Sequence, residues 1–96
     1  MKRIYKYTLL PNMEVQFVAI PKKYKWLCAQ VQDGNICLWA EVELEKITIS
    51  PKVAKTAPKY STRIHIVGTG WDVQPGMKYI GTVQQYGYVW HIYEQR

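Results

Sequence analysis

The sequence predicts an all-β protein, a small antiparallel β-sandwich or a partly closed barrel of six to seven strands. Apolar and polar residues alternate with a period of two over several short segments. The dipeptide Asp33-Gly34 lies between two apolar-rich segments, which is the pattern of a β-hairpin. We find no ten-residue stretch with the i, i+3, i+4, i+7 apolar spacing of an amphipathic helix. A chain of 96 residues has the length of one domain, so we expect a single β domain over residues 1–96.

Further strands follow from the same alternation and from the turn residues between them. In residues 14–20 both alternating sets are largely apolar, so this strand is expected to be covered on both faces. In residues 61–67, Thr62, Ile64 and Ile66 share one face. Besides the two strands of the Asp33-Gly34 hairpin, we expect strands at residues 3–9, 14–20, 61–67, 78–84 and 86–94.

A two-residue turn at Asp33-Gly34 fixes the register of the central hairpin. Its predicted facing pairs are Gln32 with Asn35, Val31 with Ile36, Ala29 with Leu38 and Leu27 with Ala40.

The same register places Cys28 opposite Trp39 and Cys37 opposite Gln30. The two cysteines are then diagonal neighbours, roughly 7–8 Å apart. This separation exceeds comfortable disulfide geometry, so we expect free cysteines in a reducing compartment.

The last hairpin has two possible registers. A three-residue loop at Gln85-Tyr86-Gly87 makes Val83 face Val89, Tyr79 face Tyr93 and Gly81 face His91, and we favour it because the first two pairs are chemically good. A two-residue turn at Tyr86-Gly87 makes Thr82 face His91 instead.

Positive charge is concentrated in the middle of the chain. The chain has 13 Lys and Arg against 7 Asp and Glu, a net charge of +6. Residues 46–71 contribute five bases and no acid. A lysine-rich loop is expected at about residues 50–60, where two prolines interrupt any periodicity. Its side chains, Lys55 and Lys59 among them, either cover an anionic ligand or keep a solvated loop soluble.

A candidate anion site follows this loop. The strand that carries Arg63 and His65 runs into Gly68-Thr69-Gly70-Trp71. Such a turn can offer backbone N–H groups and a hydroxyl to phosphate oxygens, although a tight β-turn is the more common explanation of Gly-Thr-Gly. We expect His91, in the last strand, to line the same cavity if the two strands are adjacent.

Aromatic residues are abundant. Trp39 and Trp90, inside strands, are expected in the core or at an interface. Trp26 and Trp71, flanked by polar residues, are expected to stack on a ligand.

Catalysis and metal binding are poorly supported. Neither histidine has a serine or threonine two residues later, as two-histidine phosphoesterases require, and no cysteine has an evident base. Glu41, Glu43 and Glu45 alternate on one strand, which an exposed acidic strand edge explains without a metal. We therefore expect no catalytic residue, no metal and no cofactor.

The chain resembles a family of small uncharacterised proteins of bacteriophages and prophages. The resemblance covers nearly the whole chain and implies expression in a bacterial cytoplasm, in keeping with the lack of a signal peptide or a long apolar segment. Relatives often have a histidine after Gly-Thr-Gly, where this chain has Trp71. The segments that carry the resemblance are Ile4-Tyr5-Lys6-Tyr7, Cys37-Leu38-Trp39-Ala40, His65-Ile66-Val67-Gly68-Thr69-Gly70, Tyr79-Ile80-Gly81-Thr82-Val83 and Trp90-His91-Ile92-Tyr93-Glu94.

Together these features predict a phage anti-defence protein, a homo-oligomer that sequesters an anionic nucleotide-type signal without converting it. One alternative is an inhibitor that binds a host defence protein directly. Binding of single-stranded nucleic acid on the aromatic sheet is another and less favoured one. The expected ligand-binding residues are Lys55, Lys59, Arg63, His65, Gly68, Thr69, Gly70, Trp71 and His91.

Overall fold

The computed structural model describes residues 1–44 and 60–95, and these form strands and no helix, as the alternation predicts. The predicted lysine-rich loop, with Lys55 and Lys59, lies outside the described residues, as does Glu45. The strands are β1 (Lys2–Thr8), β2 (Val15–Ala19), β3 (Lys23–Gln32), β4 (Asn35–Glu43), β5 (Ser61–Gly68), β6 (Met77–Gln85) and β7 (Tyr88–Gln95).

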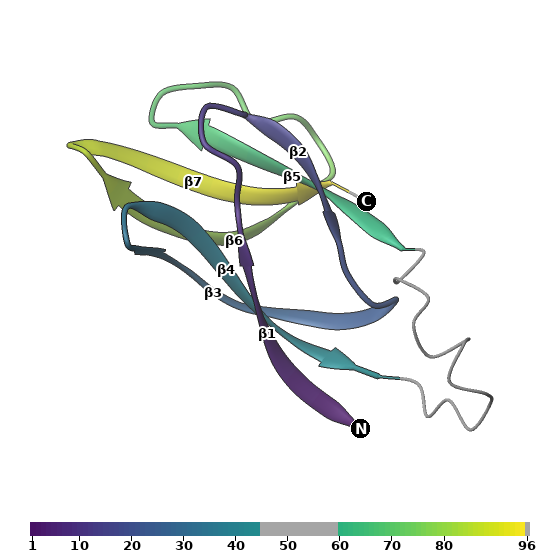
Figure 1. Cartoon of the computed structure of the whole chain (residues 1–96). Helices are drawn as coiled ribbons and strands as arrows, with labels where there is room; N and C mark the ends of the chain where they lie inside the picture. The colour runs from purple at the N-terminus through teal and green to yellow at the C-terminus, as the bar shows by residue number, and fades with distance from the viewer. Residues whose placement is uncertain (45–59, 96) are drawn as a thin grey trace.

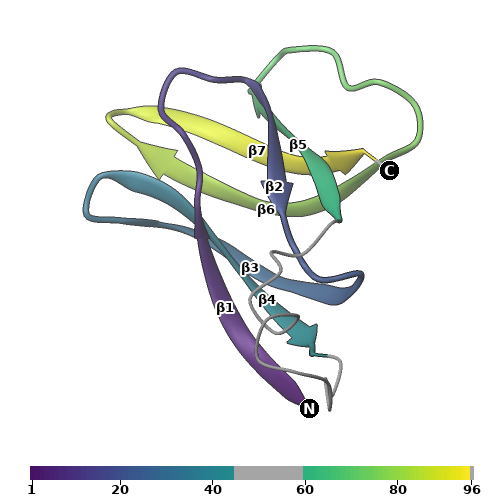
Figure 2. The same cartoon turned by 45° about the vertical axis from the view of Figure 1, so that its right-hand side comes forward.

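The strands form two antiparallel sheets that pack as a sandwich (Figures 1 and 2). One sheet has the order β1-β4-β3 and the other β2-β5-β7-β6. The sheets remain separate, so the sandwich is confirmed over the described residues and the partly closed barrel is not. Because β5 and β6 both run antiparallel to β7, residues 69–76 must return along the length of the sheet to connect them.

The central hairpin has the predicted turn. Asp33 and Gly34 have φ values of 52° and 80°, which a tight two-residue hairpin turn requires. The predicted register holds from the turn as far as Cys28, which pairs with Trp39. The prediction that Leu27 faces Ala40 was wrong, because a β-bulge at Leu27 shifts the register and Trp26 takes that position.

The last hairpin corrects the favoured register. Tyr86 and Gly87 have φ values of 51° and 82° and form a two-residue turn, so Thr82 faces His91. The three-residue loop was therefore wrong. Tyr79 nevertheless pairs with Tyr93, because an irregularity between Tyr79 and Gly81 shifts the register by one residue.

Strand β2 is covered on one face only, contrary to the prediction of two covered faces. Gln16 and Val18 are buried, whereas Val15, Phe17 and Ala19 are exposed on the outer face of the four-stranded sheet. Gln16 takes a core-facing position because its amide satisfies backbone groups of the β1–β2 connection, with hydrogen bonds to Leu10 and to the carbonyl of Met13.

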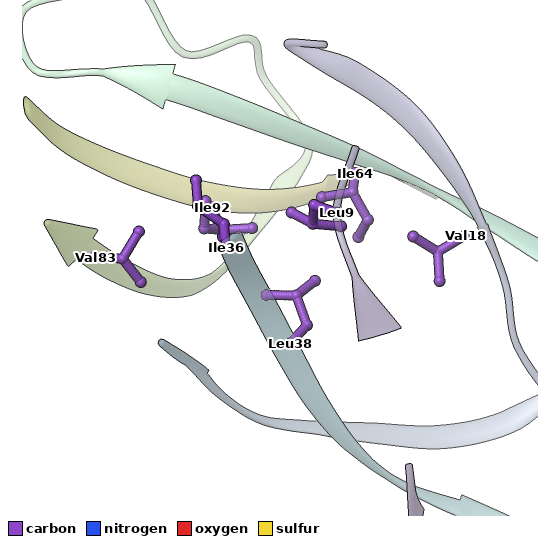
Figure 3. Close-up of a cluster of buried hydrophobic side chains, with 7 residues drawn as sticks. All are labelled: Leu9, Val18, Ile36, Leu38, Ile64, Val83 and Ile92. Carbon is purple, nitrogen blue, oxygen red and sulfur yellow. The ribbon is translucent and has the colours of Figure 1, made fainter. Parts of the chain in front are cut away.

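The main core lies between the sheets (Figure 3). Both sheets and the β1–β2 connection contribute to it, and burial of such aliphatic side chains is the main stabilising contribution. Its buried side chains are Leu9, Val18, Ile36, Leu38, Ile64, Val83 and Ile92.

A second cluster, of Ile20, Ala40 and Val42, extends the core along the three-stranded sheet. Half-buried Trp26 packs against it, and its indole donates a hydrogen bond to the buried Glu94. Its polar atom is thereby committed to the interior, and the stacking of Trp26 on a ligand stays a prediction.

The two cysteines, Cys28 and Cys37, are free and form no disulfide.

The acidic residues of β4 lie at the centre of a sheet. Glu41 and Glu43 lie on β4, the middle strand, rather than at an edge. Lysines flank both of them, with Lys25 opposite Glu41 and Lys2 and Lys23 opposite Glu43.

Candidate functional site

The structure divides the predicted site residues between the two ends of β5. Arg63 and His65 lie in its first half, whereas Gly68 ends the strand and Trp71 follows it. Gly68 lies five positions after Arg63 on the strand, a span of roughly 16 Å. Arg63 and the Gly-Thr-Gly turn therefore do not line one small pocket.

A hollow of about 330 Å³ surrounds Arg63 on the outer side of the four-stranded sheet. The guanidinium carbon of Arg63 lies 5.2 Å from the centre of the Phe17 ring, because the two residues are cross-strand partners on β5 and β2. Phe17 is 66% exposed, so its ring is accessible. The hollow is lined by Phe17, Tyr60, Ser61, Thr62, Arg63 and Gln95.

The side chain of Gln95 forms hydrogen bonds with two predicted site residues, Arg63 and His65. Its side-chain oxygen accepts a hydrogen bond from Nη1 of Arg63 at 3.2 Å and one from Nε2 of His65 at 2.8 Å. Since an amide oxygen can only accept, Nε2 of His65 carries a proton here. Arg63 is thereby held between a ring and an amide, with other guanidinium N–H groups left for a ligand.

His91 belongs to a separate chain of hydrogen bonds on the same face. Its Nε2 lies 2.9 Å from the hydroxyl of Thr69 and its Nδ1 lies 3.0 Å from the hydroxyl of Thr82. The Thr82 hydroxyl in turn lies 2.6 Å from that of Tyr79. Because His65 pairs with Tyr93 and His91 with Val67, the two histidines are diagonal neighbours on one sheet face.

The Gly-Thr-Gly segment is a tight turn over which Trp71 folds back. The N–H of Trp71 donates to the carbonyl of Gly68 at 3.1 Å, and Gly70 has a φ of +90°. A Cβ at Gly68 would lie 2.8 Å from the Trp71 indole, so glycine is required for this packing. The turn thus uses an N–H that the phosphate-binding interpretation assigned to a ligand.

Trp71 is part of an aromatic cluster at this end of the sandwich. The Trp71 ring meets the Trp90 ring edge-on, with centroids 5.8 Å apart. The Tyr88 ring stacks on the Trp90 ring, with centroids 5.7 Å apart. Trp71 is about half exposed, whereas Trp90 is half-buried and packs against the main core, as its expected place in the core or at an interface allows.

A cleft of about 490 Å³ lies beside this cluster, between the β1–β2 connection and the tips of the two hairpins. The tips are tied together, since Nε2 of Gln85 donates to the carbonyl of Gly34 at 2.7 Å. Leu10, Met13, Tyr86 and Tyr88 expose apolar surface here. Among the lining residues that the structure describes, Glu14 is the only charged one.

Sequence reasoning missed the residues that complete both hollows. Phe17 is the only phenylalanine of the chain, and the apolar residues in both alternating sets of its strand led to the expectation of two covered faces, which hid the exposure of Phe17. Gln95 carries no comparable signal. Apolar Leu10 and Met13 on either side of the Pro11-Asn12 turn were an available sign of the cleft.

Across residues 1–44 and 60–95, no group of three or more His, Cys, Asp or Glu side chains is arranged to hold a metal ion. Within the same part of the chain, no helix is long and apolar enough to cross a membrane.

Comparisons with known proteins identify a family but no function. Neither the curated proteins nor the solved structures contain a match to this chain. One family model matches, and it covers residues 1–96. The chain therefore belongs to the family described as Domain of unknown function (DUF7352).

Proposed function

We propose that this protein binds an anionic, nucleotide-type molecule without converting it, and that the ligand lies in the hollow around Arg63. The observation that carries the proposal is the position of the Arg63 guanidinium over the exposed Phe17 ring, since both residues line that hollow. The site would combine a cation for phosphate with an aromatic face for a base.

The chemistry of the lining residues supports this ligand class. A guanidinium offers a planar set of donors that matches phosphate oxygens, and charge-assisted hydrogen bonds of this kind are about twice as strong as neutral ones. Phe17 and Tyr60 supply aromatic faces, and stacking of a base on an aromatic side chain contributes roughly 1–3 kcal/mol. Ser61 and Gln95 add polar groups for the ligand's edges.

Local charge also favours an anion. None of the lining residues within the described part of the chain is acidic. The whole chain carries a net charge of +6, which attracts anions over distances of about a Debye length. In the bacteriophage setting that the sequence resemblance implies, such binding would withdraw a nucleotide signal from a host defence system.

The test is a thermal-shift and calorimetry screen against cyclic di- and trinucleotides, ADP-ribose derivatives and a short single strand. We expect saturable binding of one nucleotide class, with the compound recovered intact by chromatography. At a hundred times the dissociation constant the ligand adds about 2.7 kcal/mol to the free energy of unfolding, an easily measured stabilisation.

Two variants localise the site. Arg63→Ala is expected to weaken binding by at least about tenfold, since it removes charge-assisted hydrogen bonds. Arg3→Ala removes one positive charge from an exposed position on β1 of the other sheet and is expected to leave affinity nearly unchanged. Equal losses in both variants would show unspecific attraction, and no binding at all would refute the proposal.

A second candidate function, direct binding of a host protein, is favoured by the apolar cleft. Exposed apolar surface of this kind marks interaction sites, and Tyr86 is 81% exposed at its border. With Glu14 as the charged lining residue, the cleft suits an apolar segment that carries a basic residue, not an acidic one.

This candidate is tested with immobilised protein and bacterial lysate. Capture of one protein that Tyr88→Ser abolishes and Arg63→Ala preserves would support it. Capture that only Arg63→Ala abolishes would place the contact at the basic hollow instead.

A further inference from the structure

Strand β2 is an edge strand with an unusual lack of protection. It pairs with β5 and, among the described residues, with no other strand. Its sequence, Val15-Gln16-Phe17-Val18-Ala19, contains no charge, no proline and no bulge. Exposed edges of this composition pair readily with another strand, so natural proteins usually carry charges or bulges there.

The backbone groups that point away from β5 can be identified from the ladder. The N–H of Ile20 donates to the carbonyl of Tyr60 at 3.0 Å, and the N–H of Ile66 donates to that of Glu14 at 2.7 Å. Hydrogen-bonded and non-hydrogen-bonded positions alternate in an antiparallel pair. Residues 15, 17 and 19 therefore direct their N–H and C=O groups outward.

The other edge strands are unsuited to pairing with a second copy of this positively charged chain. Edge strand β1 carries Lys2, Arg3 and Lys6. Edge strands β3 and β6 carry lysines, and each has a register irregularity that interrupts its edge, at Leu27 and at Ile80. Like charges facing each other across a new strand pair are destabilising, so self-association through these edges is disfavoured.

We propose that two copies of this chain pair antiparallel through β2, about a two-fold axis at Phe17. In this register Phe17 faces Phe17 of the second copy, and Val15 faces Ala19. All outward N–H and C=O groups of residues 15, 17 and 19 then find partners, whereas a shift by two residues leaves one residue of each copy unpaired.

The pairing also accounts for the apolar outer face of β2. Val15 and Phe17 are exposed in the single chain, and the second copy would place apolar side chains beside both. Because the surface is self-complementary, the pair is closed and does not propagate. The inference rests on the backbone of β2 and on its outer face, and it shares Phe17 with the hollow around Arg63.

Disulfide trapping tests the register. In Phe17→Cys the two introduced cysteines face each other with Cα atoms about 5.5 Å apart, within disulfide range. We expect this variant to form a covalent dimer under mild oxidation. Val15→Cys is the matched control, since its two cysteines would lie roughly 13 Å apart, and the unsubstituted chain controls for Cys28 and Cys37.

Equilibrium sedimentation tests the edge itself. Ala19→Pro removes an outward N–H that the single chain does not use, and we expect it to raise the dimer dissociation constant at least about tenfold. Ile4→Pro makes the same change on the β1 edge. Leu9 bonds to Ile36 of β4 and Met1 to Leu44, just after β4, so even-numbered positions of β1 point outward. Ile4→Pro should leave the dimer intact.

Three results would overturn the proposal. They are a monomer at all concentrations, a dimer that Ile4→Pro disrupts as much as Ala19→Pro does, and equal trapping of Phe17→Cys and Val15→Cys. Pairing of β2 with a strand of a foreign protein would appear as the first result. Arg63→Ala removes the contact with the Phe17 ring but leaves the backbone groups of β2 in place, so we expect it to abolish ligand binding and to preserve the dimer.

Discussion

Trp26 on β3 donates its indole N–H to the carboxylate of Glu94 on β7, with 3.0 Å between Nε1 and Oε2. The same oxygen accepts hydrogen bonds from the hydroxyls of Thr62, at 2.7 Å, and of Tyr24. Since β3 belongs to one sheet and β5 and β7 to the other, this buried carboxylate joins the two layers. Thr62, one of its donors, also lines the hollow around Arg63.

Loss of this carboxylate should destabilise the fold. Glu94 is 1% exposed, and Glu94→Ala would leave buried donors of Trp26 and Thr62 without their acceptor, each costing about 1–3 kcal/mol. We expect a loss of at least about 3 kcal/mol in urea unfolding. Glu43→Ala, at an exposed position, should change the free energy of unfolding by less than about 0.5 kcal/mol. Equal effects would contradict the linking role.

Gly81 should tolerate no side chain while Ala29 faces it. A Cβ at Gly81 would lie 3.0 Å from the Cβ and 3.3 Å from the backbone N of Ala29, where β6 meets β3. Gly81→Ala should therefore cost about 1–3 kcal/mol of stability. Ala29→Gly in the same chain should recover part of that loss, and a strictly additive double-mutant cycle would refute the contact.

Tyr7 should make the free energy of unfolding decrease at alkaline pH. Burial, and secondarily the neighbouring Tyr5, raise the pKa of Tyr7 above its ordinary value of 10.0. The unfolded chain then ionises first, so this contribution to stability is complete below about pH 10 and is lost as the pH rises towards the folded pKa. Unfolding measured at about pH 8 and about pH 11 should show a smaller decrease for Tyr7→Phe than for the original chain.

Trp71 should be dispensable for binding in the Arg63 hollow. It lies beyond the far end of β5, folded over Gly68 and against Trp90. Trp71→Ala is therefore expected to change nucleotide affinity less than twofold while altering intrinsic fluorescence. A loss as large as that of Arg63→Ala would instead place the ligand at the Gly-Thr-Gly turn.

Local sequence signals predicted the strands and one hairpin register well. Alternation identifies strands because a sheet with one solvated face requires it, and Asp33-Gly34 has the backbone preferences of its turn. The bulges at Leu27 and Ile80 were not predictable in the same way, since they depend on packing across the sandwich. Those bulges decide which residues face the core.

The candidate site was predicted only in part. Arg63 and His65 were identified from charge and strand position. Their partners Phe17 and Gln95 come from β2 and β7, and no local signal pairs those strands with β5. The glycines of the Gly-Thr-Gly turn gave a weak signal for phosphate binding, because the turn itself and the packing of Trp71 already explain them.

The most direct test of the central claim is a ¹⁵N chemical-shift titration of the protein with the nucleotide that the screen selects. The account predicts that the largest saturable shifts fall on the amides of Phe17, Ser61, Arg63 and Gln95, with small changes at Thr69, Gly70 and Trp71. Shifts confined to the Gly-Thr-Gly turn, or spread evenly over the lysines of the other sheet, would contradict it.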